Sequence, residues 1–142
     1  MRKVVFLTFC LLLGHLMSMA EENHFKAHIY NNVYDVEIVM NLNEESTTIP
    51  GQEILGKVFG YLKKKTDSRV WAIMSAEISK DGKRAGIEMV NDYGSEDLNA
   101  ELTYDAKTGT YTLRQLSGST LKVSNGKKWV KLPKELVFEP QR

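Results

Sequence analysis

Hydrophobic and polar residues alternate along most of this chain with a period of two, which is typical of half-buried β-strands. In residues 34–42, five apolar side chains fall on one side of the expected strand: Tyr34, Val36, Ile38, Met40 and Leu42. The runs 70–78 and 84–90 flank Asp81-Gly82, a pair that favours a tight turn between antiparallel strands. The pattern therefore predicts an antiparallel hairpin at 70–90, with further strands around it.

Further strands are expected at 54–62, 98–104, 110–116, 121–123, 128–132 and 136–138, most of them joined by short turns such as Asn125-Gly126. Strands that follow one another through tight turns pair as a meander, whereas Greek-key sandwiches need long crossovers. We therefore predict an all-β fold: a single antiparallel meander of about eight strands, in which a lipocalin-like up-and-down barrel is favoured over a sandwich.

Residues 21–33 show no clear period, so we expect an N-terminal leader there, either a short helix or irregular chain. The barrel domain is accordingly expected to span residues 34–142. In the run 54–62, Gly56 and Gly60 have the same parity. Glycine inside a strand marks a bend or a close backbone approach, so we expect the sheet to curl here and close.

The side of the strands expected to face the lumen mixes small residues, such as Ala85 and Ala100, with larger apolar ones. The small residues could leave room for a ligand, or they could let large neighbours interdigitate in a packed core. Our leading hypothesis is a non-enzymatic barrel that binds a small apolar ligand. The residues expected to contact it are Met40, Met74, Met89, Val36, Ile38 and Ile87.

A second hypothesis rests on aromatic residues, which are enriched at interaction surfaces. Phe59, Tyr61, Trp71 and Trp129 could form an exposed face that binds a protein or a glycan. Alternatively, a neighbouring segment such as 24–33 covers these rings. Their solvent exposure distinguishes the two interpretations.

The first 20 residues read as a secretory signal peptide: Met1-Arg2-Lys3 precedes an apolar run, and Ser18-Met19-Ala20 supplies small residues for cleavage. We therefore expect a periplasmic or extracellular protein with no transmembrane segment after cleavage. The single cysteine, Cys10, lies in the apolar run, so the exported chain would form no internal disulfide. Without Arg2 and Lys3, 17 basic residues stand against 18 acidic ones, a net charge of −1 that does not indicate a nucleic-acid partner.

The residue types required for catalysis are scarce beyond residue 20. Only His24 and His28 are available as imidazole bases, and no G-x-S-x-G motif occurs. Neither the two histidines nor the acidic residues at 92–101 match a metal-binding pattern. We expect no catalytic residues, no metal and no cofactor.

Three stretches carry a resemblance: the run 54–61, the segment 104–113 around Thr108-Gly109, and the closing Val130-Lys131-Leu132-Pro133. They resemble small exported β-meander proteins of unknown function from anaerobic Gram-negative bacteria. The resemblance implies a signal peptide followed by a β-meander rich in glycine and aromatic residues. It carries no catalytic residues to this chain.

Overall fold

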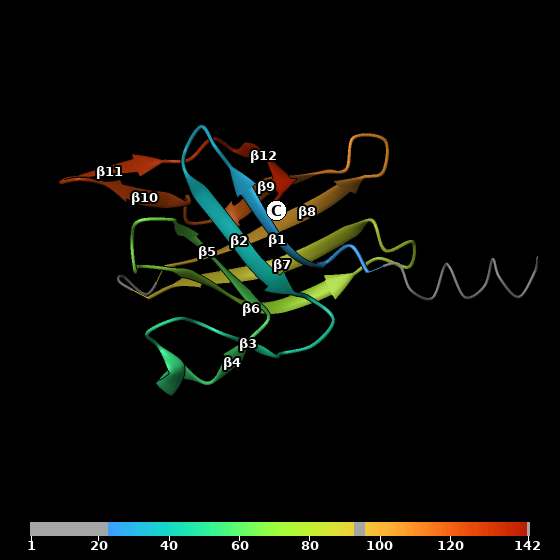
Figure 1. Cartoon of the computed structure of the whole chain (residues 1–142), viewed down its shortest axis with the longest axis horizontal. Helices are drawn as coiled ribbons and strands as arrows, with labels where there is room; N and C mark the ends of the chain where they lie inside the picture. Colours follow the sequence, from blue (N-terminus) through green and yellow to red (C-terminus); the bar gives the residue numbers. More distant parts are fainter. Residues whose placement is uncertain (1–22, 93–95, 142) are drawn as a thin grey trace, which may run out of the picture.

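The computed structural model describes residues 23–92 and 96–141, and it confirms the predicted closed antiparallel barrel. Eight strands form the wall, and their order around it is β1-β12-β9-β8-β7-β6-β5-β2 (Figure 1). Their bounds are β1 (Lys26–Asn31), β2 (Val36–Asn41), β5 (Gly60–Lys64), β6 (Trp71–Ile78), β7 (Arg84–Asn91), β8 (Asp97–Asp105), β9 (Thr110–Gly118) and β12 (Glu135–Pro140). The wall is a meander in which the first strand pairs with both the second and the last. The predicted signal peptide lies outside the described residues.

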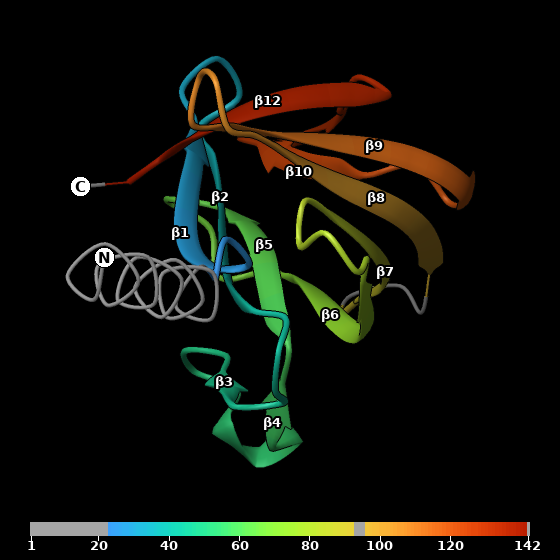
Figure 2. The same ribbon diagram turned by 90° about the vertical axis from the view of Figure 1, so that its right-hand side faces the viewer.

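Two small two-stranded sheets interrupt this meander. The first, here called the flap, contains β3 (Thr47–Thr48), a 3₁₀ turn at Glu53–Leu55 and β4 (Lys57–Val58), all between β2 and β5. The second, here called the ribbon, pairs β10 (Lys122–Asn125) with β11 (Lys128–Lys131), between β9 and β12. Figure 1 shows the ribbon projecting beyond the barrel, and Figure 2 shows the flap on the outside of its wall.

The expected leader at 21–33 is instead largely part of the barrel, because Lys26–Asn31 forms β1. Its signal in the sequence is weak because only two of its six side chains are buried: Ile29, and Asn31, whose amide donates a hydrogen bond to the Val137 carbonyl at 2.9 Å. Just before this strand, Phe25 is almost fully buried in the core. The domain therefore begins well before residue 34.

A bulge in β6 overturns the predicted inward position of Met74. Pairing between β6 and β7 shifts between Ile73 and Ser75, so an extra residue is accommodated and the alternation of faces changes there. Trp71 and Ile73 point into the core before the bulge, and Ala76 packs against it after the bulge. Met74 lies on the outside with 46% of its surface exposed.

The interior is a continuous core of buried side chains. Its largest fully buried members include Trp71, Phe25, Phe138, Ile29, Ile38, Leu62, Ile73, Met89, Leu98, Leu102 and Leu113. The same cluster includes Phe25 from the segment before β1, Val123 from the ribbon, and Leu121 and Leu132, which flank the ribbon. Small inward residues such as Ala85 and Ala100 are thus surrounded by large ones, as in a close-packed interior.

Tyr111 makes the stability of this core sensitive to alkaline pH. Burial, with a smaller contribution from Tyr104, raises the pKa of Tyr111 to about 12, from an ordinary value of 10.0. Because the unfolded chain ionises first, this contribution to stability is complete below pH 10 and is lost as the pH rises to about 12. We expect the free energy of unfolding to fall across this interval in urea titrations followed by circular dichroism.

Tyr111→Phe removes the titrating group and provides the comparison for this pH dependence. It also removes the hydrogen bond from the hydroxyl to the His24 carbonyl, so its absolute stability is expected to be lower. Its stability should nevertheless change less steeply between pH 10 and about 12 than that of the unmodified protein. Identical slopes for the two proteins would contradict this role of Tyr111.

Candidate functional site

The residues predicted to bind an apolar ligand are built into the packed core. Val36, Ile38, Met40, Ile87 and Met89 are at most 4% exposed and belong to one cluster, whereas Met74 lies outside it. The three surface hollows described below are lined by other residues. A ligand in the lumen would therefore have to displace core side chains, and its binding stays a prediction.

The predicted aromatic face does not form, because three of its four rings are covered. Trp71 lies in the core, where its indole N–H donates to the Lys122 carbonyl at 3.1 Å. Phe59 is half-buried against the same core. Tyr61 points outward but is buried beneath the flap, in a second cluster with Ile49, Val58, Val70 and Ala72. The residues 24–33 do not provide that cover; the flap does.

Trp129 remains at the surface, with 46% of its area exposed, on the second strand of the ribbon. The register of the ribbon pairs it with Ser124, and Lys122 pairs with Lys131 on the same face. The Arg69 guanidinium lies over the indole ring, 4.8 Å from its centroid, and the Lys122 ammonium lies at 5.8 Å. Both contacts are within the range of cation–π attraction.

The ribbon that carries this tryptophan is rich in lysine. Residues 121–134 contain five lysines and no aspartate or glutamate. The turn between β5 and β6 adds Arg69, and the end of β5 adds Lys64, whose ammonium lies 3.3 Å from the Asn125 side-chain oxygen at the tip of the ribbon. We define the Trp129 surface as Lys64, Arg69, Lys122, Lys127, Lys128, Trp129 and Lys131.

Two carboxylates balance part of this positive charge. Asp67 pairs with Arg69 at 2.8 Å, and this partner holds the pKa of the Asp67 carboxyl below its ordinary value. Glu96 pairs with Lys122, also at 2.8 Å. Within residues 23–92 and 96–141, by contrast, the exposed Lys127, Lys128 and Lys131 form no ion pair. The ribbon therefore presents an excess of positive charge beside a half-exposed indole ring.

Part of the Trp129 surface was predictable from the sequence. Trp129 was among the predicted interaction residues, and the lysines flanking it are adjacent in the chain. The contribution of Lys64 and Arg69 was missed, since that turn reads as a solvated connection. Only the fold brings it against the ribbon.

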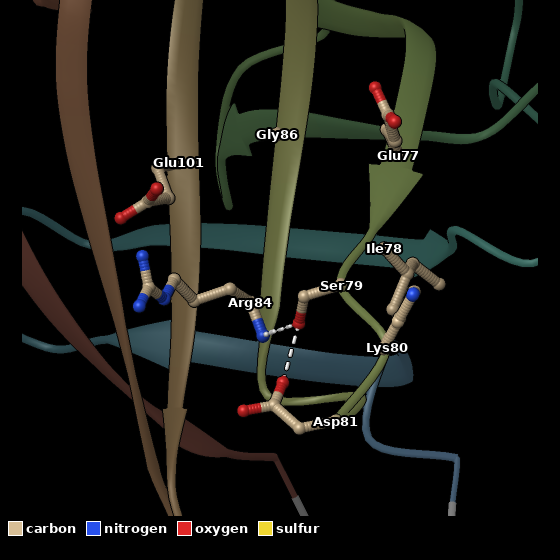
Figure 3. A pocket seen from close by; sticks show the side chains of 8 residues that line it. All are labelled: Glu77, Ile78, Ser79, Lys80, Asp81, Arg84, Gly86 and Glu101. Carbon is tan, nitrogen blue, oxygen red and sulfur yellow. Dashed lines mark hydrogen bonds between the residues drawn. The ribbon is translucent and has the colours of Figure 1, made fainter.

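The part of the barrel that the structure describes has hollows on its outside, and three of them are prominent. One of about 240 Å³ lies at the base of the ribbon, lined by residues that include Gln115 and Lys134. One of about 630 Å³ lies between Tyr30, the turn at Thr108 and the end of β12. The third, of about 530 Å³, lies over Gly86 at the opposite end of β6 from the turn that carries Arg69 (Figure 3).

In the part of the chain that the structure describes, no group of three or more His, Cys, Asp or Glu side chains is arranged to hold a metal ion. No helix among the same residues is long and apolar enough to cross a membrane. No family model matches the chain, and comparisons with curated proteins and with solved structures also give no match. The resemblance to exported β-meander proteins of anaerobic bacteria accordingly stays a prediction.

Proposed function

We propose that this protein is an exported, non-enzymatic interaction module that binds an anionic glycan through the Trp129 surface. The observation that carries the proposal is the half-exposed indole ring on a projecting ribbon, surrounded by cations of which three lack an ion pair among the described residues. The export rests on the signal peptide expected in residues 1–20.

The chemistry of the surface fits a sugar that carries negative charge. A tryptophan ring supplies a large, rigid apolar area, and the apolar side of a sugar ring can pack against the part of the Trp129 ring that Arg69 leaves exposed. Lysine ammonium groups are flexible point charges that attract carboxylate or sulfate groups without requiring one fixed geometry. Trp129 and Lys131 lie two residues apart on the same face of β11, so one bound chain can contact both.

A polymer fits this surface better than a small anion. Lys127, Lys128 and Lys131 are exposed on the ribbon, which projects beyond the barrel (Figure 1), and none of them lines one of the hollows described above. A single small anion would contact few of them, whereas a chain with repeated charges can engage several at once. Such linked contacts raise the overall affinity although each exposed ion pair contributes little.

Dextran sulfate, with uncharged dextran as its reference, tests the proposal by isothermal titration calorimetry at several salt concentrations. We expect dextran sulfate to bind with an affinity that falls as salt rises, because the exposed charges are screened. Lys127→Ala/Lys128→Ala/Lys131→Ala should weaken binding about tenfold or more, the sum expected of three exposed pairs. All three lysines are exposed, so the barrel should keep its thermal midpoint.

A matched control removes the same charge elsewhere: Lys57→Ala/Lys83→Ala/Lys107→Ala changes three exposed lysines outside the Trp129 surface. This control should bind dextran sulfate almost as well as the unmodified protein. Equal losses for the two triple variants would show a response to overall charge and would overturn the proposed surface.

The variant Trp129→Ala tests whether the bound polymer is recognised as a glycan or only as an anion. Inorganic polyphosphate carries repeated charges but no sugar ring, so the proposal requires this variant to weaken dextran sulfate binding more than polyphosphate binding. Equal effects on the two polymers would contradict a sugar-contacting role for the indole. Binding to anionic phospholipid vesicles with none to dextran sulfate would assign the surface to membranes instead.

A further inference from the structure

Gly86 is a glycine that the fold does not require. Of the eight glycines within the described residues, six have the positive φ that favours glycine: Gly51, Gly56, Gly82, Gly109, Gly118 and Gly126. At Gly60 a side chain would collide with the β2 backbone, 2.6 Å from the Val39 carbonyl oxygen. Gly86 has no positive φ, and a Cβ placed there would meet no atom within 4 Å.

A glycine in the middle of a strand normally weakens it, since it loses more conformational freedom on folding and contributes no side chain. The absence of a side chain at Gly86 leaves space on the outer face of the sheet. The pairing of β6, β7 and β8 places Glu77, Gly86 and Glu101 in one row across the outer face. With no side chain in the middle, the hollow of about 530 Å³ opens between the two carboxylate-bearing residues (Figure 3).

Two carboxylates beside this hollow retain their capacity to accept hydrogen bonds. Within the described segments, neither Glu77 nor Glu101 forms an ion pair or a side-chain hydrogen bond. The third carboxylate of the lining, Asp81, is already used by the turn: it accepts from the Ser79 hydroxyl at 2.6 Å and from the Lys83 backbone N–H at 3.0 Å. Glu77 and Glu101 are therefore the acceptors available to a ligand.

Two cations also line the hollow and partly balance these acceptors. The lining includes Lys80 and Arg84, which carry one positive charge each and act only as hydrogen-bond donors. The lining as a whole has three carboxylates, Glu77, Asp81 and Glu101, against these two cations, which gives a net charge of −1. A lining whose charges nearly balance and that offers both acceptors and donors favours a neutral ligand whose groups can both donate and accept, and the hydroxyl group has this property.

We propose that the hollow over Gly86 is a binding site for a neutral sugar residue. The sugar ring lies against the bare backbone of Gly86 and the half-buried Ile78, donates hydroxyl hydrogen bonds to Glu77 and Glu101, and accepts from Arg84. The hollow is open to solvent on the face of the sheet, so a longer chain can extend beyond the bound residue. This site is independent of the Trp129 surface, which lies at the other end of β6.

The test follows backbone amide shifts in two-dimensional ¹H–¹⁵N spectra of the full exported chain, with neutral oligosaccharides added separately. Cellohexaose, chitohexaose, maltohexaose and mannohexaose serve as probes at about 5 mM, since an open site of this kind is expected to bind with a dissociation constant near 1 mM. At least one probe should shift the amides of Gly86, Glu77 and Glu101 in a saturable way. The absence of saturable shifts with every probe would overturn the proposal.

Gly86→Val places a side chain in the hollow, at a position where a Cβ meets no atom within 4 Å, and it adds a residue that strands prefer. It should reduce the affinity for the bound oligosaccharide at least tenfold while the thermal midpoint stays the same or rises. Glu101→Ala should also weaken binding. Glu88→Ala, on the same outer face but outside the hollow, should not.

Binding by Gly86→Val that equals binding by the unmodified protein would show that the sugar contacts another surface, and the proposed site would be wrong. Dextran sulfate binding provides a separate readout. It should be unchanged in Gly86→Val, so a failure at this hollow is distinguishable from a failure at the Trp129 surface.

Discussion

Ile73→Asp is expected to prevent folding of the barrel, whereas Met74→Asp, one residue further along β6, is expected to have little effect. Ile73 is fully buried in the core, so an aspartate there would be an unpaired charge without water, at a cost of about 4 kcal/mol or more. Such a cost is a large part of the stability of a typical domain. Met74 is 46% exposed, and the change there should be within about 0.5 kcal/mol.

Urea denaturation followed by tryptophan fluorescence measures this difference, because Trp71 is buried beside the mutated strand. Strict alternation through residues 70–78 would predict the opposite, with Met74 inside. A larger loss of stability for Met74→Asp than for Ile73→Asp would show that β6 has no bulge and that its faces are reversed.

Gly60→Val should destabilise the barrel by about 3 kcal/mol, since overpacking a well-packed position costs this much. A Cβ at Gly60 would lie 2.9 Å from both Cα and Cβ of Met40, besides the Val39 oxygen, so β2 and β5 would have to move apart. Gly86→Val changes the same residue type in another strand of the same wall. A Cβ at this position meets no atom within 4 Å, so the change should leave the free energy of unfolding unchanged or raise it by up to about 1 kcal/mol.

Thermal unfolding of the two valine variants provides the comparison, with both proteins at the same concentration and pH. We expect the thermal midpoint of Gly86→Val to equal or exceed that of the unmodified protein. The midpoint of Gly60→Val should lie well below both. A midpoint for Gly60→Val equal to that of the unmodified protein would contradict the close approach of β2 and β5.

Much of the fold was predictable, because strands with one wet face show their period in the sequence. The inward residues of β2, β7 and β8 follow strict alternation, as with Ile38, Ile87 and Leu102. Alternation was misleading in β6, where both faces are apolar before the bulge and either parity could be chosen. The barrel was also predicted to curl at both Gly56 and Gly60, but only Gly60 lies in a barrel strand; Gly56, with a φ of 82°, follows the 3₁₀ turn of the flap.

The surface was less predictable than the core, because exposure depends on segments that are distant in sequence. The flap covers Tyr61, and its own residues gave no indication of where they would pack. Gly86 illustrates the same limit. In the sequence it is one more glycine within a strand, and only the absence of neighbouring atoms distinguishes it from Gly60.

Closure of the wall has a consequence for the order of folding. Because the chain is synthesised from its N-terminus, β1 is present long before β12, the strand that completes its pairing. Pairing between such distant segments forms slowly, because most of the chain must be ordered first. Until then, β1 leaves an open edge to which another chain could add. Strands β1 and β12 pair through only two residue pairs, Ile29 with Pro140 and Tyr30 with Glu139. We therefore expect this pairing to be the last to form and the first to open.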